Sequence, residues 1–168
     1  MSQTSALSPL AGAAKASAIA LYAKPSPGYA AKRAAAEALL RRAAALGAVT
    51  QANSLGVEDM VLTDMIRRLQ LPISVFVLET GRLHTETLAL LERTQALEGI
   101  EVQVFRPKQE AVIQFIRTQG QDAIYNSVAQ RKQCCDIRKM EPLSRALAGK
   151  KGWITGLQFS GINFTRKD

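Results

Sequence analysis

The sequence predicts an α/β fold in which a parallel sheet is flanked by helices. From residue 48 onward, strand-like segments alternate with segments of helical periodicity, the pattern typical of a parallel sheet with helices on its faces. The segment 71–79, LPISVFVLE, is an almost continuous β-branched and aromatic run, as expected of a strand buried on both faces. Gly47, Gly99 and Gly120 each follow a helical segment, where glycine commonly ends a helix.

The first elements follow from composition and spacing. Alanine has the highest helix propensity, so the alanine-rich segment 29–47 predicts a helix. The segment 48–53 is strand-like, and apolar residues recur on one side of a helix expected over 58–70. The buried strand over 71–79 then leads into a helix over 85–99.

The later elements repeat the alternation. We expect a strand over 100–107 and a helix over 108–120. The two cysteines come next and lead into a helix over about 136–149, and GWITG at 152–156 is a last short strand. The chain length of 168 residues suits one domain of ordinary size.

Composition restricts the partners. The net charge of +8 favours an anionic partner, such as a nucleic acid, a nucleotide or another phosphate or sulfate ligand. Aromatic residues make up only 5% and are not interleaved with basic stretches, which disfavours a specific nucleic-acid platform. No apolar run approaches the length of a membrane span, and two cysteines do not make a disulfide framework. A cytoplasmic location without membrane association is therefore predicted.

Ligands of parallel α/β sheets bind beyond the carboxyl ends of the strands. SLGVED, residues 54–59, follows the first strand and bears a glycine, so its backbone N–H groups could face an anion; a plain connection explains it equally well. It lacks the Gly-Lys-Ser/Thr triplet of a Walker loop. In 78–84, LETGRLH, Arg82 offers a planar fork for phosphate. His84, the only histidine, is either held by local hydrogen bonds at a helix start or catalytic.

Both cysteines, Cys134 and Cys135, lie in the basic stretch RKQCCDIRKMEPL. Three interpretations are open: two buried structural thiols, a redox dithiol, or ligands of a metal or iron–sulfur cluster. The polar surroundings argue against two core residues, and adjacent cysteines form only a strained disulfide. A cluster takes four thiolates, and this sequence supplies two.

Four segments together resemble the assimilatory adenylyl-sulfate reductases, relatives of the phosphoadenylyl-sulfate reductases. The segments, in order, are SLGVEDMVL at 54–62, VFVLETGRLHTETL at 75–88, CCDIRKMEPL at 134–143 and GWITG at 152–156. The resemblance implies an adenine nucleotide α-hydrolase-like, Rossmann-like fold. It also implies reduction of adenylyl sulfate to sulfite and AMP, in which a cysteine thiolate attacks the sulfate sulfur and thioredoxin or a similar dithiol releases sulfite.

The resemblance further implies site residues. Cys134 and Cys135 match two of the four ligands of a [4Fe-4S] cluster. By the same resemblance, the presence of these cysteines favours adenylyl sulfate over its 3′-phosphorylated form as the substrate. Lys139 matches a lysine near the cluster and the sulfate. The substrate-binding residues implied by the matched segments are Ser54, Leu55, Gly56, Glu58, Asp59, Leu78, Glu79, Thr80, Gly81, Arg82, His84, Lys139 and Gly156.

The chain departs from the family after residue 156. Gln158 and Phe159 stand where a pair of arginines is expected, and neither the later cysteine pair nor the C-terminal cysteine nucleophile is present in the sequence. We therefore hypothesise a truncated, frameshifted or fragmentary reductase, incomplete at its C-terminus and with little or no activity alone. The expected organisation is an Ala/Ser-rich arm over 1–28, the reductase-like domain over 29–156 and a divergent tail over 157–168.

Two other functions are kept as alternatives. One is an ATP-using relative of the same fold, such as the small subunit of sulfate adenylyltransferase. Those proteins carry a lysine-containing phosphate loop, which SLGVED does not match. The other is a non-catalytic nucleotide-binding module.

Overall fold

The computed structural model describes residues 27–157. The chain divides into two compact units, Met1–Ala35 and Ala36–Asp168. Of the first unit, only residues 27–35 are described, and they include the beginning of helix α2, Tyr29–Ala45. Most of the expected N-terminal arm lies outside the described residues, as does the tail after residue 157 with Gln158 and Phe159.

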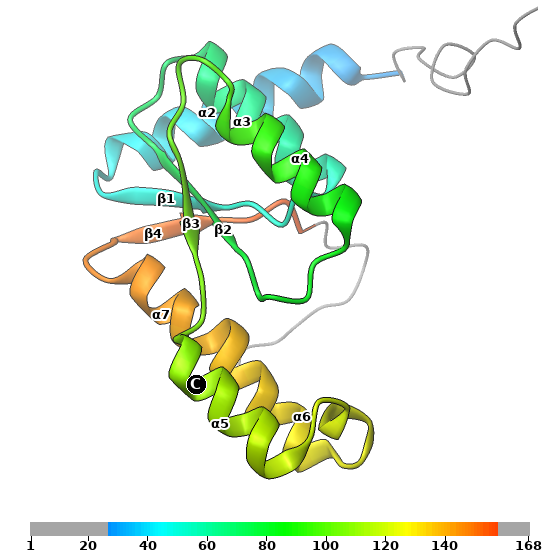
Figure 1. Ribbon diagram of the computed structural model, residues 1–168. Coiled ribbons are helices and arrows are strands. Elements are labelled where there is room, and N and C mark those ends of the chain that lie inside the picture. The colour runs from blue at the N-terminus through cyan, green and yellow to red at the C-terminus, as the bar shows by residue number, and fades with distance from the viewer. Residues whose placement is uncertain (1–26, 158–168) are drawn as a thin grey trace, which may run out of the picture. The chain divides into compact units, whose positions relative to one another are not determined.

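The second unit contains a parallel sheet of four described strands in the order β3-β2-β1-β4 (Figure 1). These strands are β1 (Val49–Ala52), β2 (Ser74–Leu78), β3 (Val102–Phe105) and β4 (Gly152–Ile154). Thr50 of β1 is paired with Ser74 on one side and with Trp153 on the other, so β1 lies between its sequence neighbour and the last strand. The parallel α/β architecture predicted from the alternating pattern is confirmed.

Helices connect successive strands. They are α3 (Val57–Arg68), α4 (Thr85–Gln95), α5 (Gln109–Gln119), α6 (Val128–Cys135) and α7 (Glu141–Leu147), with a 3₁₀ turn at Ala123–Tyr125 and a π turn at Asp136–Met140. Most elements are shorter at their ends than the sequence pattern predicts. Within the described residues, no helix combines the length and the apolar character needed to cross a bilayer.

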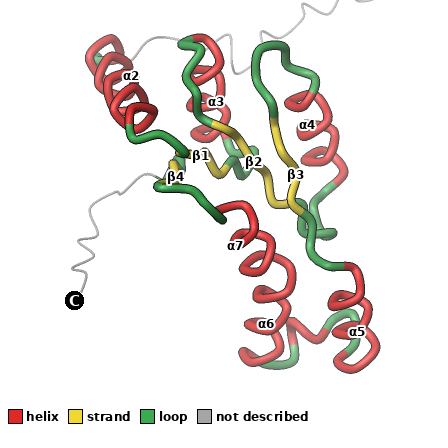
Figure 2. The backbone as a smooth tube through the Cα atoms, turned by 90° about the vertical axis from the view of Figure 1, so that its left-hand side faces the viewer, coloured by secondary structure: helices red, strands yellow, loops and turns green. Residues whose placement is uncertain are grey.

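Strand β2 is buried on both faces, as its continuous apolar sequence predicts. Val75 and Val77 pack with Leu91 of α4 on one face. Phe76 points to the other face and meets Phe105 edge to face, with ring centroids 5.9 Å apart. Figure 2 shows α3 and α4 on one side of the strands and α7 on the other. The central strand is thus enclosed between two helical layers, which leaves its carboxyl end as the accessible part.

One helix prediction is wrong in its start. The helix expected over 136–149 begins upstream, because Ser127 caps α6 by accepting a hydrogen bond from the Gln130 amide over 3.1 Å. The cysteine pair therefore lies on the last turn of α6 rather than before a helix. The π turn follows, and in it the Glu141 amide donates to the carbonyl of Asp136. Pro142 has no N–H to donate back into the helix, which interrupts the α-helical pattern at this place.

Candidate functional site

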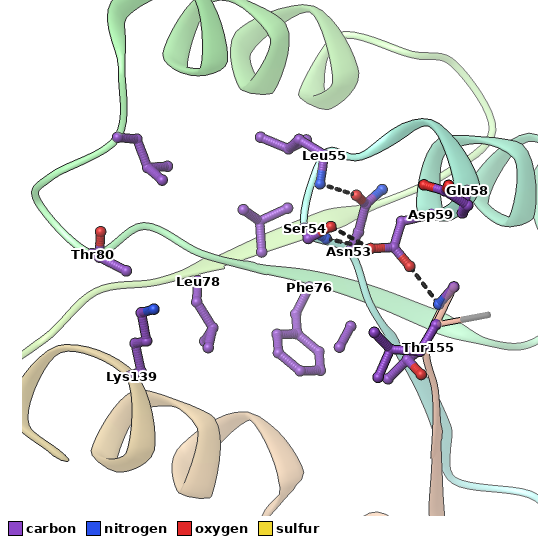
Figure 3. Close-up of a pocket in the computed structure, with 15 residues that line it drawn as sticks. Asn53, Ser54, Leu55, Glu58, Asp59, Phe76, Leu78, Thr80, Lys139 and Thr155 are labelled. Carbon is purple, nitrogen blue, oxygen red and sulfur yellow. Dashed lines mark hydrogen bonds between the residues drawn. The ribbon is translucent and has the colours of Figure 1, made fainter. Parts of the chain in front are cut away.

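A cavity of about 520 Å³ opens at the carboxyl ends of β1, β2 and β4 (Figure 3). Its place agrees with the rule for ligands of parallel α/β sheets. It draws residues from both loops that the sequence singled out and from the π turn after the cysteines. The lining residues are Ala52, Asn53, Ser54, Leu55, Glu58, Asp59, Phe76, Val77, Leu78, Thr80, Leu83, Lys139, Thr155, Gly156 and Leu157.

The loop between β1 and α3 is held in an unusual conformation. Leu55 has a left-handed backbone with φ of +65°, which costs a branched residue about 1–2 kcal/mol. Two contacts offset this cost: the Leu55 amide donates to Asn53 Oδ1 over 2.6 Å, and the Leu55 side chain is buried in the core beside β2. Backbone strain of this kind is concentrated at functional sites. The loop then enters α3 through Gly56, which offers no capping side chain.

Asp59, in the first turn of α3, joins this loop to the end of β4. Its Oδ2 accepts hydrogen bonds from the Ser54 amide at 2.8 Å and the Ser54 hydroxyl at 2.6 Å. Its Oδ1 accepts one from the Gly156 amide at 2.7 Å. Figure 3 shows these bonds at one end of the pocket. Only 7% of Asp59 is exposed, and the three donors satisfy the carboxylate where it is buried.

A buried polar network supports the start of α3. The Gln51 side-chain amide donates to the Asp59 carbonyl over 2.8 Å, and the Thr63 hydroxyl lies 2.9 Å from Gln51 Oε1. The Asn53 side-chain amide donates to the same hydroxyl over 2.7 Å. Sequence reasoning did not single out Gln51 and Asn53. The available signal was two polar residues in the strand-like segment 48–53.

Gly156 is required by the close approach of β4 to α3. A Cβ atom at this position would lie 2.6 Å from Asp59 Oδ1 and 2.9 Å from both the Asp59 nitrogen and Glu58 Cβ. These distances are shorter than real Cβ contacts, and all three neighbouring atoms belong to residues in the first turn of α3. The absence of a side chain at Gly156, the second glycine of GWITG, therefore allows its backbone amide to reach the Asp59 carboxylate.

Lys139 and Thr80 lie on the opposite side of the pocket from Asp59 and Thr155 (Figure 3). Lys139 is the one positively charged side chain among the described lining residues, and it comes from the π turn. Its neighbour Arg138 is buried with 8% of its surface exposed and donates from Nη1 to the Thr80 carbonyl over 2.7 Å. An ammonium group at a pocket mouth attracts an anionic ligand.

The structure brings together many of the residues that the family resemblance implied. Ser54, Leu55, Glu58, Asp59, Leu78, Thr80, Lys139 and Gly156 all line the cavity. Sequence reasoning did not identify the remaining lining residues: Ala52, Asn53, Phe76, Val77, Leu83, Thr155 and Leu157. Apart from Asn53 and Thr155, these are apolar residues, which in a sequence look the same as core residues.

Other implied residues do not line this cavity. Gly56 is the N-cap of α3. Glu79 accepts from the Gly81 amide at 2.6 Å and pairs with Arg106 at 3.1 Å. The exposed Arg82 donates to the Gln121 carbonyl over 2.6 Å. His84 is exposed at the N-cap position of α4 and makes no capping side-chain hydrogen bond there.

The cysteine pair lies outside the cavity lining. Cys134 is buried with Phe115 and Ala123, whereas Cys135 is partly exposed, and both thiols are free. Between residues 27 and 157 there is no cluster of three or more histidine, cysteine, aspartate or glutamate side chains that could hold a metal ion. The described residues thus supply two thiols and do not by themselves complete a four-thiolate site.

Comparison with known proteins gives a family match. The family model described as phosphoadenosine phosphosulfate reductase domain matches residues 48–160. The chain is 46% identical over 125 residues to the adenosine 5′-phosphosulfate reductase of Allochromatium vinosum. The aligned region covers 74% of this chain and 49% of that protein. The chain is 49% identical over 105 residues to the reductase of the same name from Burkholderia cepacia, covering 62% and 42%. The chain thus spans about half the length of these curated relatives.

A solved structure shares the fold. The phosphoadenylyl-sulfate reductase from Candida auris, in a phosphate complex, superposes with a TM-score of 0.61 at 22% sequence identity. The match covers 73% of this chain and 60% of that one. At this identity the likeness shows the shared fold alone, the arrangement of strands and helices.

Proposed function

The chain belongs to the phosphoadenosine phosphosulfate reductase domain family, and from this premise we propose that its pocket binds adenylyl sulfate for reduction to sulfite and AMP. One observation carries the proposal. Ser54, Thr80, Lys139 and Gly156 come from four segments that resemble reductase motifs, and all four line one cavity. The names of the relatives favour adenylyl sulfate as the substrate.

The pocket suits a nucleotide in size and in chemistry. Its volume of about 520 Å³ falls within the range of about 300–1,000 Å³ common for small-molecule sites. Leu78, Leu83 and Phe76 offer apolar surface for an adenine ring. We assign Lys139 to the anionic end of the ligand, because an ammonium group forms charge-assisted hydrogen bonds with phosphate or sulfate oxygens.

The start of α3 contributes a second attraction for an anion. The positive end of the helix dipole and the free N–H groups of the first turn favour negative charge at this place. Glu58 and Asp59 oppose the attraction with their own charges, but the Asp59 carboxylate is directed at Ser54 and Gly156. In this proposal the phosphosulfate lies between the loop at 54–56 and Lys139.

The reduction itself needs thiols beyond those in the described site. A thiolate sulfur forms a bond to the sulfate sulfur, the bond from that sulfur to the AMP phosphate oxygen breaks, and AMP leaves. A second thiol then attacks the resulting S-sulfonate, forms a disulfide and releases sulfite. Because both cysteines of this sequence lie on α6 outside the pocket lining, we propose that an additional cysteine makes the attack and that a thioredoxin-like dithiol supplies the electrons.

We further propose Cys134 and Cys135 as two of the four ligands of a [4Fe-4S] cluster. The pair lies about one helical turn before Lys139, and the described residues provide no third or fourth thiolate. Iron and labile sulfide should be assayed in the chain purified without oxygen. A cluster that is lost in Cys135→Ser would support the pair as ligands and would mean that the other two ligands come from a second copy of the chain or from another protein. Iron and sulfide contents that Cys135→Ser leaves unchanged would contradict the proposal.

Isothermal titration calorimetry with adenylyl sulfate, AMP and ATP tests the proposed substrate. We expect adenylyl sulfate to bind more tightly than ATP. Lys139→Ala should lower the affinity for adenylyl sulfate by about tenfold or more, the loss typical of one charged hydrogen bond. Lys132→Ala is the matched control, since Lys132 is an exposed lysine of α6 outside the pocket lining. Preferential binding of ATP would favour the ATP-using alternative and contradict the proposal.

A further inference from the structure

Asp59 occupies a place where a carboxylate is unfavourable for the proposed ligand. It lines a cavity assigned to an anion, and an uncompensated negative charge there would repel phosphate or sulfate. Yet both of its oxygens are directed at groups of the protein itself. Oδ2 accepts two hydrogen bonds from Ser54, and Oδ1 accepts one from the Gly156 amide. The carboxylate is therefore compensated within the chain before any ligand enters.

The two partners of Asp59 belong to different walls of the pocket. Ser54 begins the loop between β1 and α3, whereas Gly156 follows β4, 97 residues away from Asp59 in the sequence. Strands β1 and β4 pair along Val49–Gln51, but the pocket lies beyond their carboxyl ends, where the ladder no longer joins them. Among the described residues, the Asp59 carboxylate connects the loop at Ser54 with the segment at Gly156 beyond the strand ends.

The position of Asp59 is itself well defined. Gln51 donates to its carbonyl over 2.8 Å, and the Thr63 hydroxyl lies 3.0 Å from the same oxygen. Gln51 and Thr63 are both fully buried. On the other side, Gly156 approaches so closely that any larger residue would collide with the first turn of α3. The backbone of Asp59 is thus held by Gln51 of β1 and Thr63 of α3. Its carboxylate faces donors from two residues, Ser54 and Gly156, which cannot move apart without breaking these bonds.

From these contacts we propose that Asp59 is a positioning residue, which sets the separation between the loop at Ser54 and the end of β4 at Gly156. It acts through these two residues and does not touch the ligand. The inference rests on the proposed function in one respect, since it assumes that the pocket binds an adenine nucleotide. It reassigns Asp59, which the resemblance placed among the substrate-binding residues, from contact with the substrate to the shaping of its site.

Asp59→Asn tests the proposal with almost no change in shape. An amide has one acceptor oxygen, so its NH₂ group faces either Ser54 or the Gly156 amide, and donor opposes donor. We expect the affinity for AMP, measured by calorimetry, to fall by about tenfold or more. Asp64→Asn is the control, since Asp64 is on the same helix but forms ion pairs with Arg67 and Arg68 away from the pocket. AMP binding by Asp59→Asn within about twofold of the wild type would overturn the inference.

A double-mutant cycle separates positioning from general destabilisation. If Asp59 acts through Ser54, Ser54→Ala should weaken AMP binding in the wild type but add less than about twofold in the Asp59→Asn background. Effects that multiply fully in the double variant would contradict this mechanism. Both variants should be compared at a temperature where circular dichroism shows them folded.

Amide hydrogen exchange provides a test that does not depend on nucleotide binding. The Ser54 and Gly156 amides both donate to Asp59, so they should exchange about tenfold faster or more in Asp59→Asn and remain unchanged in Asp64→Asn. Unchanged exchange at both amides would overturn the positioning role. If the wild-type chain binds neither AMP nor adenylyl sulfate, the proposed function fails, and the exchange rates still decide whether Asp59 joins the two segments.

Discussion

The guanidinium of Arg138 donates a hydrogen bond from Nη1 to the carbonyl oxygen of Thr80 over 2.7 Å, joining residues 58 positions apart. Arg138 belongs to the π turn that follows the cysteine pair, and Thr80 belongs to the loop after β2. Thr80 and Lys139, the residue after Arg138, both line the pocket. This hydrogen bond therefore links the position of Lys139 to the loop at Thr80, and the two residues form one wall of the pocket.

Replacing Arg138 with alanine should loosen this wall. The Thr80 carbonyl loses its donor and the buried guanidinium is removed, so we expect a loss of about 1–3 kcal/mol in the free energy of unfolding. AMP affinity should fall as well, because Lys139 and Thr80 are no longer held together. Urea unfolding and calorimetry measure the two effects. Arg131→Ala, at an exposed position of α6, should change stability by less than about 0.5 kcal/mol; an equal loss in both variants would contradict the role of Arg138.

Gly81→Ala should be destabilising for two reasons. Gly81 has φ of +71°, which costs an alanine about 1–2 kcal/mol, and its new Cβ would lie 3.0 Å from Arg138 Nη1. Gly149→Ala is a close control, because Gly149 has φ of +73° and no described atom within 4 Å of such a Cβ. Urea unfolding measures how much more unfolding free energy Gly81→Ala loses than Gly149→Ala, and this difference reports the contact with Arg138. It should disappear in an Arg138→Ala background, and its persistence there would point to another cause.

Gly156→Ala should displace β4 from the first turn of α3. Its Cβ would lie 2.6 Å from Asp59 Oδ1 and 2.9 Å from Glu58 Cβ, and overpacking of this kind costs about 1–3 kcal/mol. The Gly156 amide should then move away from Asp59, and AMP binding should weaken. Gly152→Ala, within β4 itself, meets its nearest atom at 3.9 Å and should leave binding unchanged. Thermal unfolding and calorimetry of both variants distinguish a local collision from a general intolerance of alanine in β4.

Glu141 should contribute a pH-dependent stabilisation. Hydrogen bonds from Arg145 hold the pKa of the Glu141 carboxyl below its ordinary value of 4.5, and nearby Lys108 acts in the same direction. A lowered pKa in the folded state means that the stabilisation is present above the ordinary value and is lost as the pH falls through the lowered one. The melting temperature of Glu141→Gln should therefore be below that of the wild type at pH 7, and the two should converge in acid. A difference that stays constant with pH would contradict this origin.

Much of the fold was predictable because its elements differ in local sequence. Strand β2 is recognisable from SVFVL, since a strand covered on both faces has to be apolar at every position. Helix α6, Val128–Cys135, was missed because its local sequence carries little signal. Its stretch VAQRKQCC has no apolar periodicity, and its beginning depends on a single capping serine, Ser127. A helix stabilised mainly at its cap and by packing of Cys134 has little periodic signal.

The pocket residues likewise divide into those with a recognisable local sequence and those without one. Ser54, Thr80, Lys139 and Gly156 were identified because they lie in segments that resemble reductase motifs. Phe76 and Val77 were missed, because an apolar residue lining a pocket and one filling a core have the same sequence signature. The role of Asp59 could not be derived from the sequence either, since its partner Gly156 is 97 residues away.

The sequence by itself determined the alternation of strands and helices apart from α6, the family resemblance and the places along the chain where a ligand site was expected, because propensity, periodicity and motif spacing are local properties. Only the tertiary structure decided what each site residue faces. It directed Asp59 at Ser54 and Gly156, brought Arg138 to Thr80, and left Arg82 and His84 outside the cavity lining. The physical reason is that the direction of a side chain depends on which distant segments pack beside it, and no short stretch of sequence contains that information.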